Sequence, residues 1–290
     1  MKTLHVVVGP TASGKTAYAI KLAKELGTEV ISADSRQFYK ELPIGSAAPT
    51  LQEQSEVKHH LVGHLSIKDT YTAAQFAEDA KAIIEEIFKT HDHVVLCGGS
   101  GLYIDALVFG FDEIPPVSSE IREKCNNIFE QGGLNALHSI LKEVDPDFLK
   151  DEQLALNPRR CIRALEVYYS KGIPMSQMKK REKKAQYNII CYYPSLSRDE
   201  IYNRINARTL KMLEDGLLKE CEQVKEFSYT QALQTVGYKE VFAMWNGELS
   251  ESELVNAIQQ STRRYAKRQD TWFRNQLLKA VGEENVRYFN

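Results

Sequence analysis

The chain has 290 residues, of which 43% are hydrophobic and 26% charged, and 37 Lys+Arg against 39 Asp+Glu give a net charge of −2. This composition excludes a disordered chain, and no apolar run reaches the ~20 residues that span a bilayer. The start of the sequence lacks a long apolar segment, and the five cysteines contain no Cys-x-x-Cys spacing. We therefore expect a cytoplasmic protein of one large or two smaller domains, without a disulfide framework or a structural zinc site.

The first third of the chain alternates strand and helix patterns. In chain order, these patterns predict a strand at 4–8, a helix at 15–26, a strand at 29–33, a helix at 72–90 and a strand at 94–97. Thr72 and Gln75 have the spacing of a capping box at the start of the second helix. Such alternation is typical of an α/β core with a parallel sheet.

Helical patterns dominate the rest of the chain. Residues 118–184 read as helical without strands, 188–193 read as a strand, and the remainder reads as helical. Its longest helix runs from Ser250 to about Lys279, with Ser250 and Glu253 as its capping box. We therefore expect an α/β core domain formed by 1–115 and 186–290, interrupted by a helical insertion domain at 116–185.

A phosphate-binding motif joins the first predicted strand to the first helix. Gly9-Pro10-Thr11-Ala12-Ser13-Gly14-Lys15-Thr16 matches G-x-x-x-x-G-K-[ST]. The glycines let backbone N–H groups surround phosphate oxygens, and the helix that follows adds its positive end. The Lys15 ammonium reaches the phosphates, and the Thr16 hydroxyl can ligate Mg²⁺. The motif predicts a P-loop NTPase-like core and a bound di- or triphosphate, as in ATP-binding proteins, but not which bond breaks.

Asp34 follows the second predicted strand, at the sheet edge where ligands bind in open α/β folds. Three interpretations compete: it holds Mg²⁺, acts as a general base, or caps the next segment. The strand at 94–97 is followed by Gly98-Gly99-Ser100-Gly101, where a usual P-loop ATPase carries an acidic residue. This absence counts against an ATP-dependent small-molecule kinase, the enzymatic alternative, and leaves the Ser100 hydroxyl facing the site.

Three basic clusters favour a nucleic-acid partner despite the nearly neutral net charge. They lie at Arg159–Arg163, at Lys179–Lys184, and along the last long helix, where Arg263, Arg264, Lys267, Arg268, Arg274 and Lys279 stand against one acid, Asp270. Helical spacing gives this last cluster a basic stripe, with Leu254, Tyr265 and Trp272 facing the core. The alternative is a solvated face on which Asp270 pairs with Lys267 or Arg274. The histidines His59, His60 and His64 match no common metal-ligand spacing.

The ordered set of segments 9–16, 34–37, 45–50, 98–103, 159–166, 204–208, 236–240 and 266–274 resembles the bacterial tRNA dimethylallyltransferases. Three departures stand out: Ala48 replaces a usual Lys, Val62-Gly63 stand where an acid is usual, and Ser100 replaces a Thr. The resemblance implies that a monomeric enzyme transfers a dimethylallyl group from dimethylallyl diphosphate to the exocyclic amine of adenosine 37 in tRNA.

The resemblance also implies roles for residues. Residues 9–16 and Arg208 hold the diphosphate; Lys15, Arg208 and Thr16 with Mg²⁺ stabilise it as it leaves; Asp34 takes the amine proton and Ser100 assists. The implied tRNA contacts are Asp34, Ser35, Arg36, Gln37, Ser100, Arg122, Arg159, Arg160, Cys161, Ile162, Arg163, Gln234, Thr235, Val236, Gly237, Tyr238, Lys239, Lys267, Arg268, Gln269, Thr271, Trp272 and Arg274. A kinase and an RNA-binding module without transfer chemistry are the alternatives.

Overall fold

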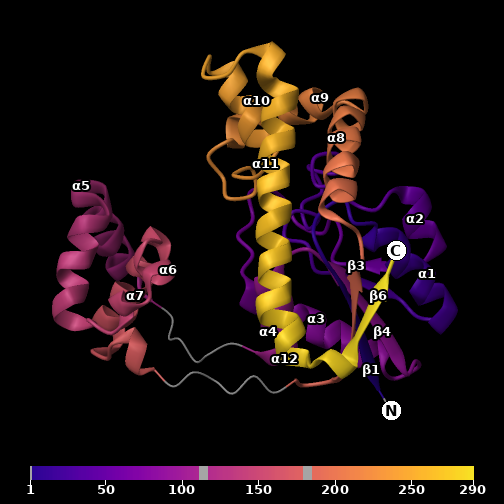
Figure 1. Ribbon diagram of the computed structural model, residues 1–290, viewed down its shortest axis with the longest axis horizontal. Coiled ribbons are helices and arrows are strands. Elements are labelled where there is room, and N and C mark those ends of the chain that lie inside the picture. Colours follow the sequence, from indigo (N-terminus) through magenta and orange to yellow (C-terminus); the bar gives the residue numbers. More distant parts are fainter. Residues whose placement is uncertain (1, 111–116, 179–184) are drawn as a thin grey trace. The chain divides into compact units, whose positions relative to one another are not determined.

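The computed structural model describes residues 2–110, 117–178 and 185–290, which form two compact units (Figure 1). Unit 1 combines Met1–Gly110 with Lys183–Asn290, and unit 2 is Phe111–Glu182. Both junctions fall at or next to residues outside the described ranges, so the predicted domain bounds stay a prediction. The basic cluster Lys179–Lys184 also lies outside the described residues. None of the helices in the described ranges is long and apolar enough to cross a bilayer.

Unit 1 is built on a six-stranded sheet with the order β3-β2-β4-β1-β5-β6, in which every neighbouring pair is parallel. The strands are β1 (Thr3–Val8), β2 (Val30–Ser32), β3 (His59–His60), β4 (His93–Gly98), β5 (Asn188–Pro194) and β6 (Val286–Phe289). The four predicted strands are confirmed. The prediction that the chain is helical after residue 193 is wrong at β6, and β3 was not predicted.

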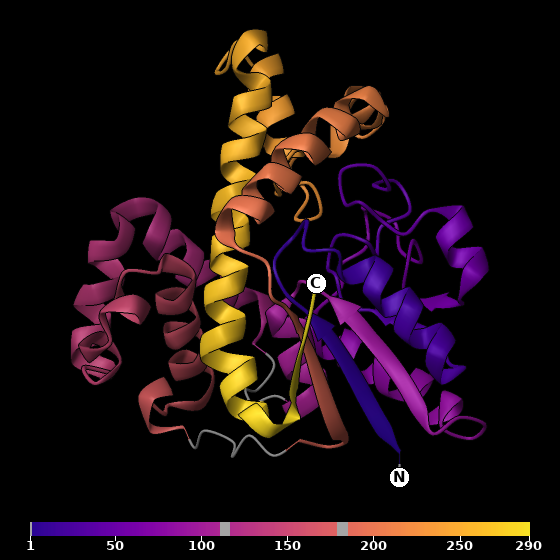
Figure 2. The same ribbon diagram turned by 45° about the vertical axis from the view of Figure 1, so that its right-hand side comes forward.

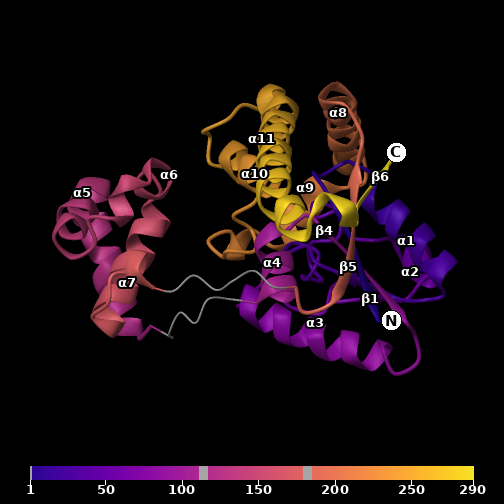
Figure 3. The same cartoon turned by 60° about the horizontal axis from the view of Figure 1, so that its bottom comes forward.

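Side chains that alternate along the strands pack into apolar cores on the two faces of the sheet. Val7 of β1 packs with α1 (Lys15–Leu26) on one face, whereas Val6 packs with α3 (Ala73–Ile87) and α4 (Gly101–Phe109) on the other (Figure 3). Because both faces are covered, β1 is buried along its whole length and reads in sequence as a continuous apolar run. This core fixes the carboxyl ends of β1, β2 and β4 at one edge of the sheet.

The other helices of unit 1 are α2 (Leu51–Glu56), α8 (Arg198–Glu214), α9 (Leu217–Gln223), α10 (Tyr238–Trp245), α11 (Glu251–Trp272) and α12 (Leu278–Val281). The long helix predicted to reach about Lys279 ends at Trp272, where a π-helical turn, Phe273–Leu277, begins. The predicted capping boxes at Thr72 and Ser250 are present. Beyond the end of the sheet where β1 terminates, α8 and α11 continue side by side and carry α9 and α10 (Figures 1 and 2).

Unit 2 is helical in its described residues, as predicted. Its helices are α5 (Ser119–Val144), α6 (Glu152–Ala155) and α7 (Pro158–Lys171). Gly133 interrupts α5 with a φ of 61°, which turns the chain back on itself. The two arms enclose an apolar core that contains Leu137, Leu141, Phe148 and Leu165. The helices therefore form a small body with its own core.

Candidate active site

A hollow of about 110 Å³, partly open to solvent, lies at the carboxyl ends of β1, β2 and β4. Its floor is the phosphate loop, represented by Thr11, Ala12, Lys15 and Thr16. The hollow is further lined by Asp34, Arg36, Gln37, Gly45, Ser46, Ala47, Cys97, Gly98, Ile205, Arg208, Met212, Leu217, Thr235, Val236, Gly237, Ile258, Thr262, Tyr265 and Gln269. Segments that are distant in sequence therefore meet at one site within unit 1.

The phosphate loop has the backbone shape that its sequence predicts. Gly9 has a φ of 146°, and Ala12 and Gly14 have left-handed φ values of 64° and 85°. Alternation of left- and right-handed residues turns successive N–H groups toward one point, which makes an anion-binding nest. A Cβ at Gly9 would lie 2.6 Å from the Pro194 ring, so only glycine fits there. Gly9, Pro10, Ser13 and Gly14 thus shape the loop without lining the hollow.

Two half-buried cations, Lys15 and Arg208, lie beside this loop. Lys15 donates from Nζ to the Pro10 carbonyl at 2.7 Å, and Arg208 donates from Nη1 to Thr11 Oγ1 at 3.3 Å. Burial lowers the pKa of Lys15 to about 8, against the opposing effects of Cys97 and Asp34. Burial also lowers the pKa of Arg208. Because desolvation disfavours both charges, an anion bound between them relieves an unfavourable arrangement.

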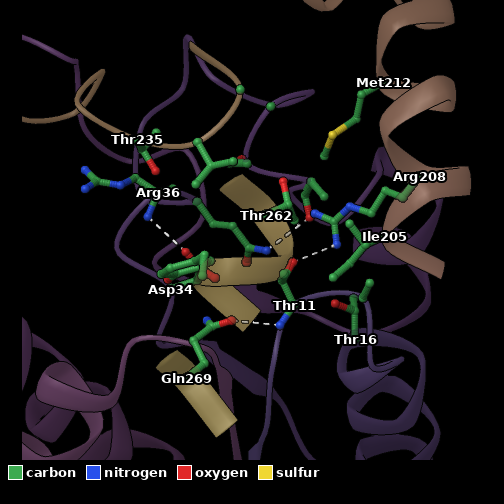
Figure 4. Close-up of a pocket in the computed structure, with 18 of the residues that line it drawn as sticks. Thr11, Thr16, Asp34, Arg36, Ile205, Arg208, Met212, Thr235, Thr262 and Gln269 are labelled. Carbon is green, nitrogen blue, oxygen red and sulfur yellow. Dashed lines mark hydrogen bonds between the residues drawn. The ribbon is translucent and has the colours of Figure 1, made fainter. Parts of the chain in front are cut away.

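Asp34 lies two residues beyond β2, on the opposite side of the hollow from Arg208 (Figure 4). Its Oδ1 accepts a hydrogen bond from the Arg36 backbone N–H at 3.0 Å, which fixes the carboxylate. The Arg36 guanidinium in turn donates to the carbonyls of Gln231, at 2.9 Å, and Ala232, at 3.3 Å. The described residues supply no hydrogen bond to Asp34 Oδ2, so this oxygen can accept a proton from a ligand.

Ser100 lies behind this turn and does not line the hollow. Its Oγ accepts from the Ser35 backbone N–H at 2.9 Å, and its hydroxyl donates to Ser35 Oγ at 3.1 Å. In this structure the Ser100 hydroxyl is bonded to Ser35, and its predicted role in the site stays a prediction. The contacts instead give Ser100 and Ser35 the role of bracing the segment that carries Asp34.

Gln269 of α11 joins two loops of the site. Its Oε1 accepts from the Thr11 N–H at 2.8 Å, and its Nε2 donates to the Gly99 carbonyl at 2.9 Å. The side chain is 7% exposed. The resemblance implied a tRNA contact here, but both polar ends of the amide are already bonded within the protein. Gln269 therefore anchors the phosphate loop, and its implied tRNA contact stays a prediction.

Some cations of the basic stripe of α11 form ion pairs or hydrogen bonds within the protein, and others are exposed. Arg274 pairs with Asp270 at 3.0 Å, as the solvated-face interpretation expects, and Arg263 donates to Asn206 of α8 at 2.7 Å. Lys267 and Arg268 are exposed, as are Arg264 and Thr271. Trp272 is partly buried, with its ring where a Cβ on Gly101 would lie 2.3 Å away. Within the described residues, Arg264, Lys267 and Arg268 are therefore the exposed cations of α11 that pair with no acidic side chain.

The other implied tRNA-contact segments are only partly accessible. Thr235, Val236 and Gly237 line the hollow, and Gln234 and Lys239 are exposed. In unit 2, Arg159 and Arg160 are exposed, Ile162 is half-buried, and Arg163 and Arg122 lie 2.9 and 4.0 Å from Glu166. Tyr238 and Cys161 are both 0% exposed. Both side chains fill apolar cores, and the predicted tRNA contacts at Tyr238 and Cys161 stay predictions.

Several lining residues were not predicted. Tyr265, assigned above to the core, lines the hollow, and burial raises its pKa. Met212, Leu217 and Ile258 give the hollow an apolar end; their helical spacing signals burial but not which cavity they face. A second hollow adjoins the first and is lined by Ala48, Val62 and Gly63, so the departures at 48 and 62–63 share one place.

Residues 37–276 match the family model described as IPP transferase. The chain belongs to the IPP transferase family. It is 43% identical over 273 residues to the tRNA dimethylallyltransferase of Cytophaga hutchinsonii, covering 94% of this chain and 90% of that protein. It is 40% identical over 291 residues to tRNA dimethylallyltransferase 1 of Bacteroides thetaiotaomicron, covering 100% and 92%.

Solved structures of the family have the same fold. The full-length tRNA isopentenylpyrophosphate transferase of Bacillus halodurans superposes with a TM-score of 0.71 and 34% identity, covering 100% of this chain and 90% of that one. A eukaryotic dimethylallyltransferase acting on tRNA superposes with a TM-score of 0.84 and 25% identity, covering 100% and 74%. These IPP transferases confirm the predicted P-loop-like α/β fold, and the kinase alternative receives no support from them.

Proposed function

We propose that this IPP transferase family member transfers a dimethylallyl group from dimethylallyl diphosphate to the exocyclic amine of adenosine 37, beside the anticodon of tRNA. The observation that carries the proposal is the pairing of two features in one hollow. A phosphate loop with two half-buried cations, Lys15 and Arg208, lies on one side. On the other side lies the Asp34 carboxylate, whose Oδ2 receives no hydrogen bond from the described residues. The first suits a departing diphosphate and the second suits a nucleophile that must lose a proton.

The leaving group governs the first half of the reaction. As the carbon–oxygen bond breaks, negative charge grows on the diphosphate, and Lys15 and Arg208 stabilise it more in the transition state than in the bound substrate. Thr16 lines the hollow and offers a hydroxyl. No group of three His, Cys, Asp or Glu capable of holding a metal exists in the described part of the chain. Mg²⁺ usually binds through one or two protein groups plus substrate phosphates. Thr16 would hold Mg²⁺, which would neutralise diphosphate charge.

The nucleophile governs the second half. The amine of adenine is weakly nucleophilic because its lone pair is delocalised into the ring. Asp34 Oδ2 accepts an amine proton as the nitrogen–carbon bond forms, so that the product amine is neutral. The purine must leave the base stack to enter the hollow, as in other enzymes that modify bases. Exposed Lys267 and Arg268 would contact tRNA phosphates, and Arg159 and Arg160 of unit 2 would bind the anticodon stem-loop.

The test is incubation of the purified protein with labelled dimethylallyl diphosphate, Mg²⁺ and bulk bacterial tRNA, followed by nucleoside analysis. We expect label in a modified adenosine and release of one diphosphate for each group transferred. Label that stays in the donor, or phosphoryl transfer from ATP in its place, would refute the proposal. In line with the family resemblance, we also propose that the enzyme acts as a monomer in the cytoplasm.

A further inference from the structure

Glu220 is a buried carboxylate that none of the motifs above includes. It belongs to α9 and is 5% exposed. Its Oε2 accepts from the Ile44 backbone N–H at 2.8 Å, and its Oε1 accepts from the Gly45 backbone N–H at 2.9 Å. The Tyr238 hydroxyl donates to the same Oε1 at 2.6 Å. One carboxylate therefore joins three segments that are far apart in sequence.

Each of the joined segments also lines the hollow. The loop that Glu220 holds contributes Gly45, Ser46 and Ala47, α9 contributes Leu217, and the turn before Tyr238 contributes 235–237. Thr235 lies across the hollow from Thr11 and Thr16 (Figure 4). The Glu220 carboxylate thus lies behind the wall that is opposite the phosphate loop.

Gly45 shows how closely this wall is assembled. A Cβ on Gly45 would lie 2.5 Å from the Tyr238 ring. The backbone of Gly45 is not in the left-handed region, so the conformation itself admits other residues and only the Tyr238 contact requires glycine. Tyr238 is fully buried and holds its hydroxyl on Glu220, so the ring cannot move aside without breaking that bond.

We infer that Glu220 is a positioning residue, whose carboxylate holds the loop 44–47 against Tyr238 and so sets the wall that faces the phosphate loop. The inference rests on the proposed function, because the wall would orient the flipped purine and the prenyl carbon. Charge-assisted bonds to two adjacent N–H groups hold a loop in one geometry. Reacting groups need such a fixed geometry, since a misplacement of about 1 Å can slow a reaction about a hundredfold.

The variant Glu220→Gln tests this with minimal change of shape. A carboxylate presents two acceptor atoms, whereas an amide presents one acceptor and one donor. Whichever way the amide is turned, its NH₂ group meets a backbone N–H of Ile44 or Gly45. The matched control is Glu222→Gln, which makes the same change at an exposed position of the same helix. The second test variant is Gly45→Ala, which displaces the loop from Tyr238 and leaves Glu220 intact.

Two measurements separate positioning from general stability. In Glu220→Gln, amide hydrogen exchange at Ile44 and Gly45 should rise at least about tenfold, while exchange in β1 and β4 stays unchanged. The single-turnover rate constant for transfer should fall at least about tenfold, because it reports only on folded molecules and their geometry. Gly45→Ala should show the same two changes, and Glu222→Gln neither.

Loss of reaction amplitude at an unchanged rate constant would mean that the carboxylate serves folding alone, and would overturn the inference. Unchanged exchange at Ile44 and Gly45 in Glu220→Gln would overturn it as well. Failure of the proposed function looks different. In that case the wild-type protein modifies no tRNA, whereas the exchange measurement still reports whether Glu220 holds the loop.

Discussion

Asp34→Asn isolates the proton-accepting role of Asp34 from its role in the turn. The amide keeps an oxygen at the Oδ1 position, so the 3.0 Å bond from the Arg36 N–H is retained. At the Oδ2 position it places an NH₂ group, which cannot accept a proton from the attacking amine. The perturbation is thus confined to the one oxygen that the described residues leave without a hydrogen bond.

The expected size follows from what a positioned base contributes. General base catalysis supplies about 10²- to 10⁴-fold in rate, so transfer should fall at least about a hundredfold, equivalent to about 2.7 kcal/mol. The Kd for tRNA should stay within about threefold, because the exposed cations of α11 and α7 are unchanged. The KM for the donor should also change little, since Lys15 and Arg208 are intact. Assays belong at pH 7, because loss of the Asp34 charge removes one effect that raises the Lys15 pKa.

The assay is single-turnover transfer from labelled donor with tRNA in excess, together with filter binding of tRNA. The matched control is Asp69→Asn, since the Asp69 carboxylate also accepts from a backbone N–H, that of Ser66, but lies exposed and away from the hollow. Transfer by Asp34→Asn at the wild-type rate would refute the general-base role. So would a loss of transfer matched by an equal loss of tRNA affinity.

Three further predictions follow from charged groups. Lys267→Ala combined with Arg268→Ala should weaken tRNA binding and reduce its salt dependence by about two phosphate contacts, measured by titration at several salt concentrations. An unaltered dependence of the tRNA Kd on salt would contradict these contacts. The control Arg274→Ala should change the salt dependence less, because Arg274 already pairs with Asp270. Because burial lowers the Lys15 pKa to about 8, the donor KM should rise between pH 7 and 9, and Lys15→Met should raise the Tm of the ligand-free protein at pH 7. Burial and His93 lower the His5 pKa from 6.5 to about 4, so the folded state resists a proton that the unfolded chain takes up. His5 should therefore contribute a fall of up to about 1.4 kcal/mol per pH unit in the free energy of unfolding as pH drops through this range. In His5→Gln the pH dependence measured by urea unfolding should be smaller by this share, with the contributions of His59 and His64 remaining.

Elements with strong local signals were predictable from sequence. The buried run of β1, the capping boxes at Thr72 and Ser250, and the amphipathic pattern of α3 each specify their structure without distant contacts. By contrast, β3 has two residues and β6 four, and β6 has one buried side chain. Such short edge strands are held by backbone bonds to a neighbour, so their side chains carry little periodic pattern.

In the candidate site, too, some residues could be predicted from short local motifs and others could not. The phosphate loop and Asp34 were predictable because each is a short motif beside a strand. The resemblance transferred residue positions but not their contacts, so Gln269, Ser100 and Tyr238 were assigned to substrates although the structure bonds them within the protein. Whether a helical residue faces a cavity or a core depends on which helices cross, and periodicity carries no information about that.

The packing at the end of β4 explains why no acidic residue follows this strand, where a usual P-loop ATPase carries one. A Cβ at Gly98 would lie 2.1 Å from the Ala33 carbonyl oxygen, and one at Gly99 would lie 2.4 Å from Gln269 Nε2. No side chain fits at Gly98 while β2 keeps its place, and one at Gly99 would displace the Gln269 amide, so the packing at the end of β4 disfavours a carboxylate where phosphoryl-transfer ATPases usually carry one. The volume is taken by the backbone that carries Asp34 and by the amide that anchors Thr11. The same packing therefore holds in place both the phosphate loop, through Thr11, and the segment that carries Asp34, the residue proposed as the base.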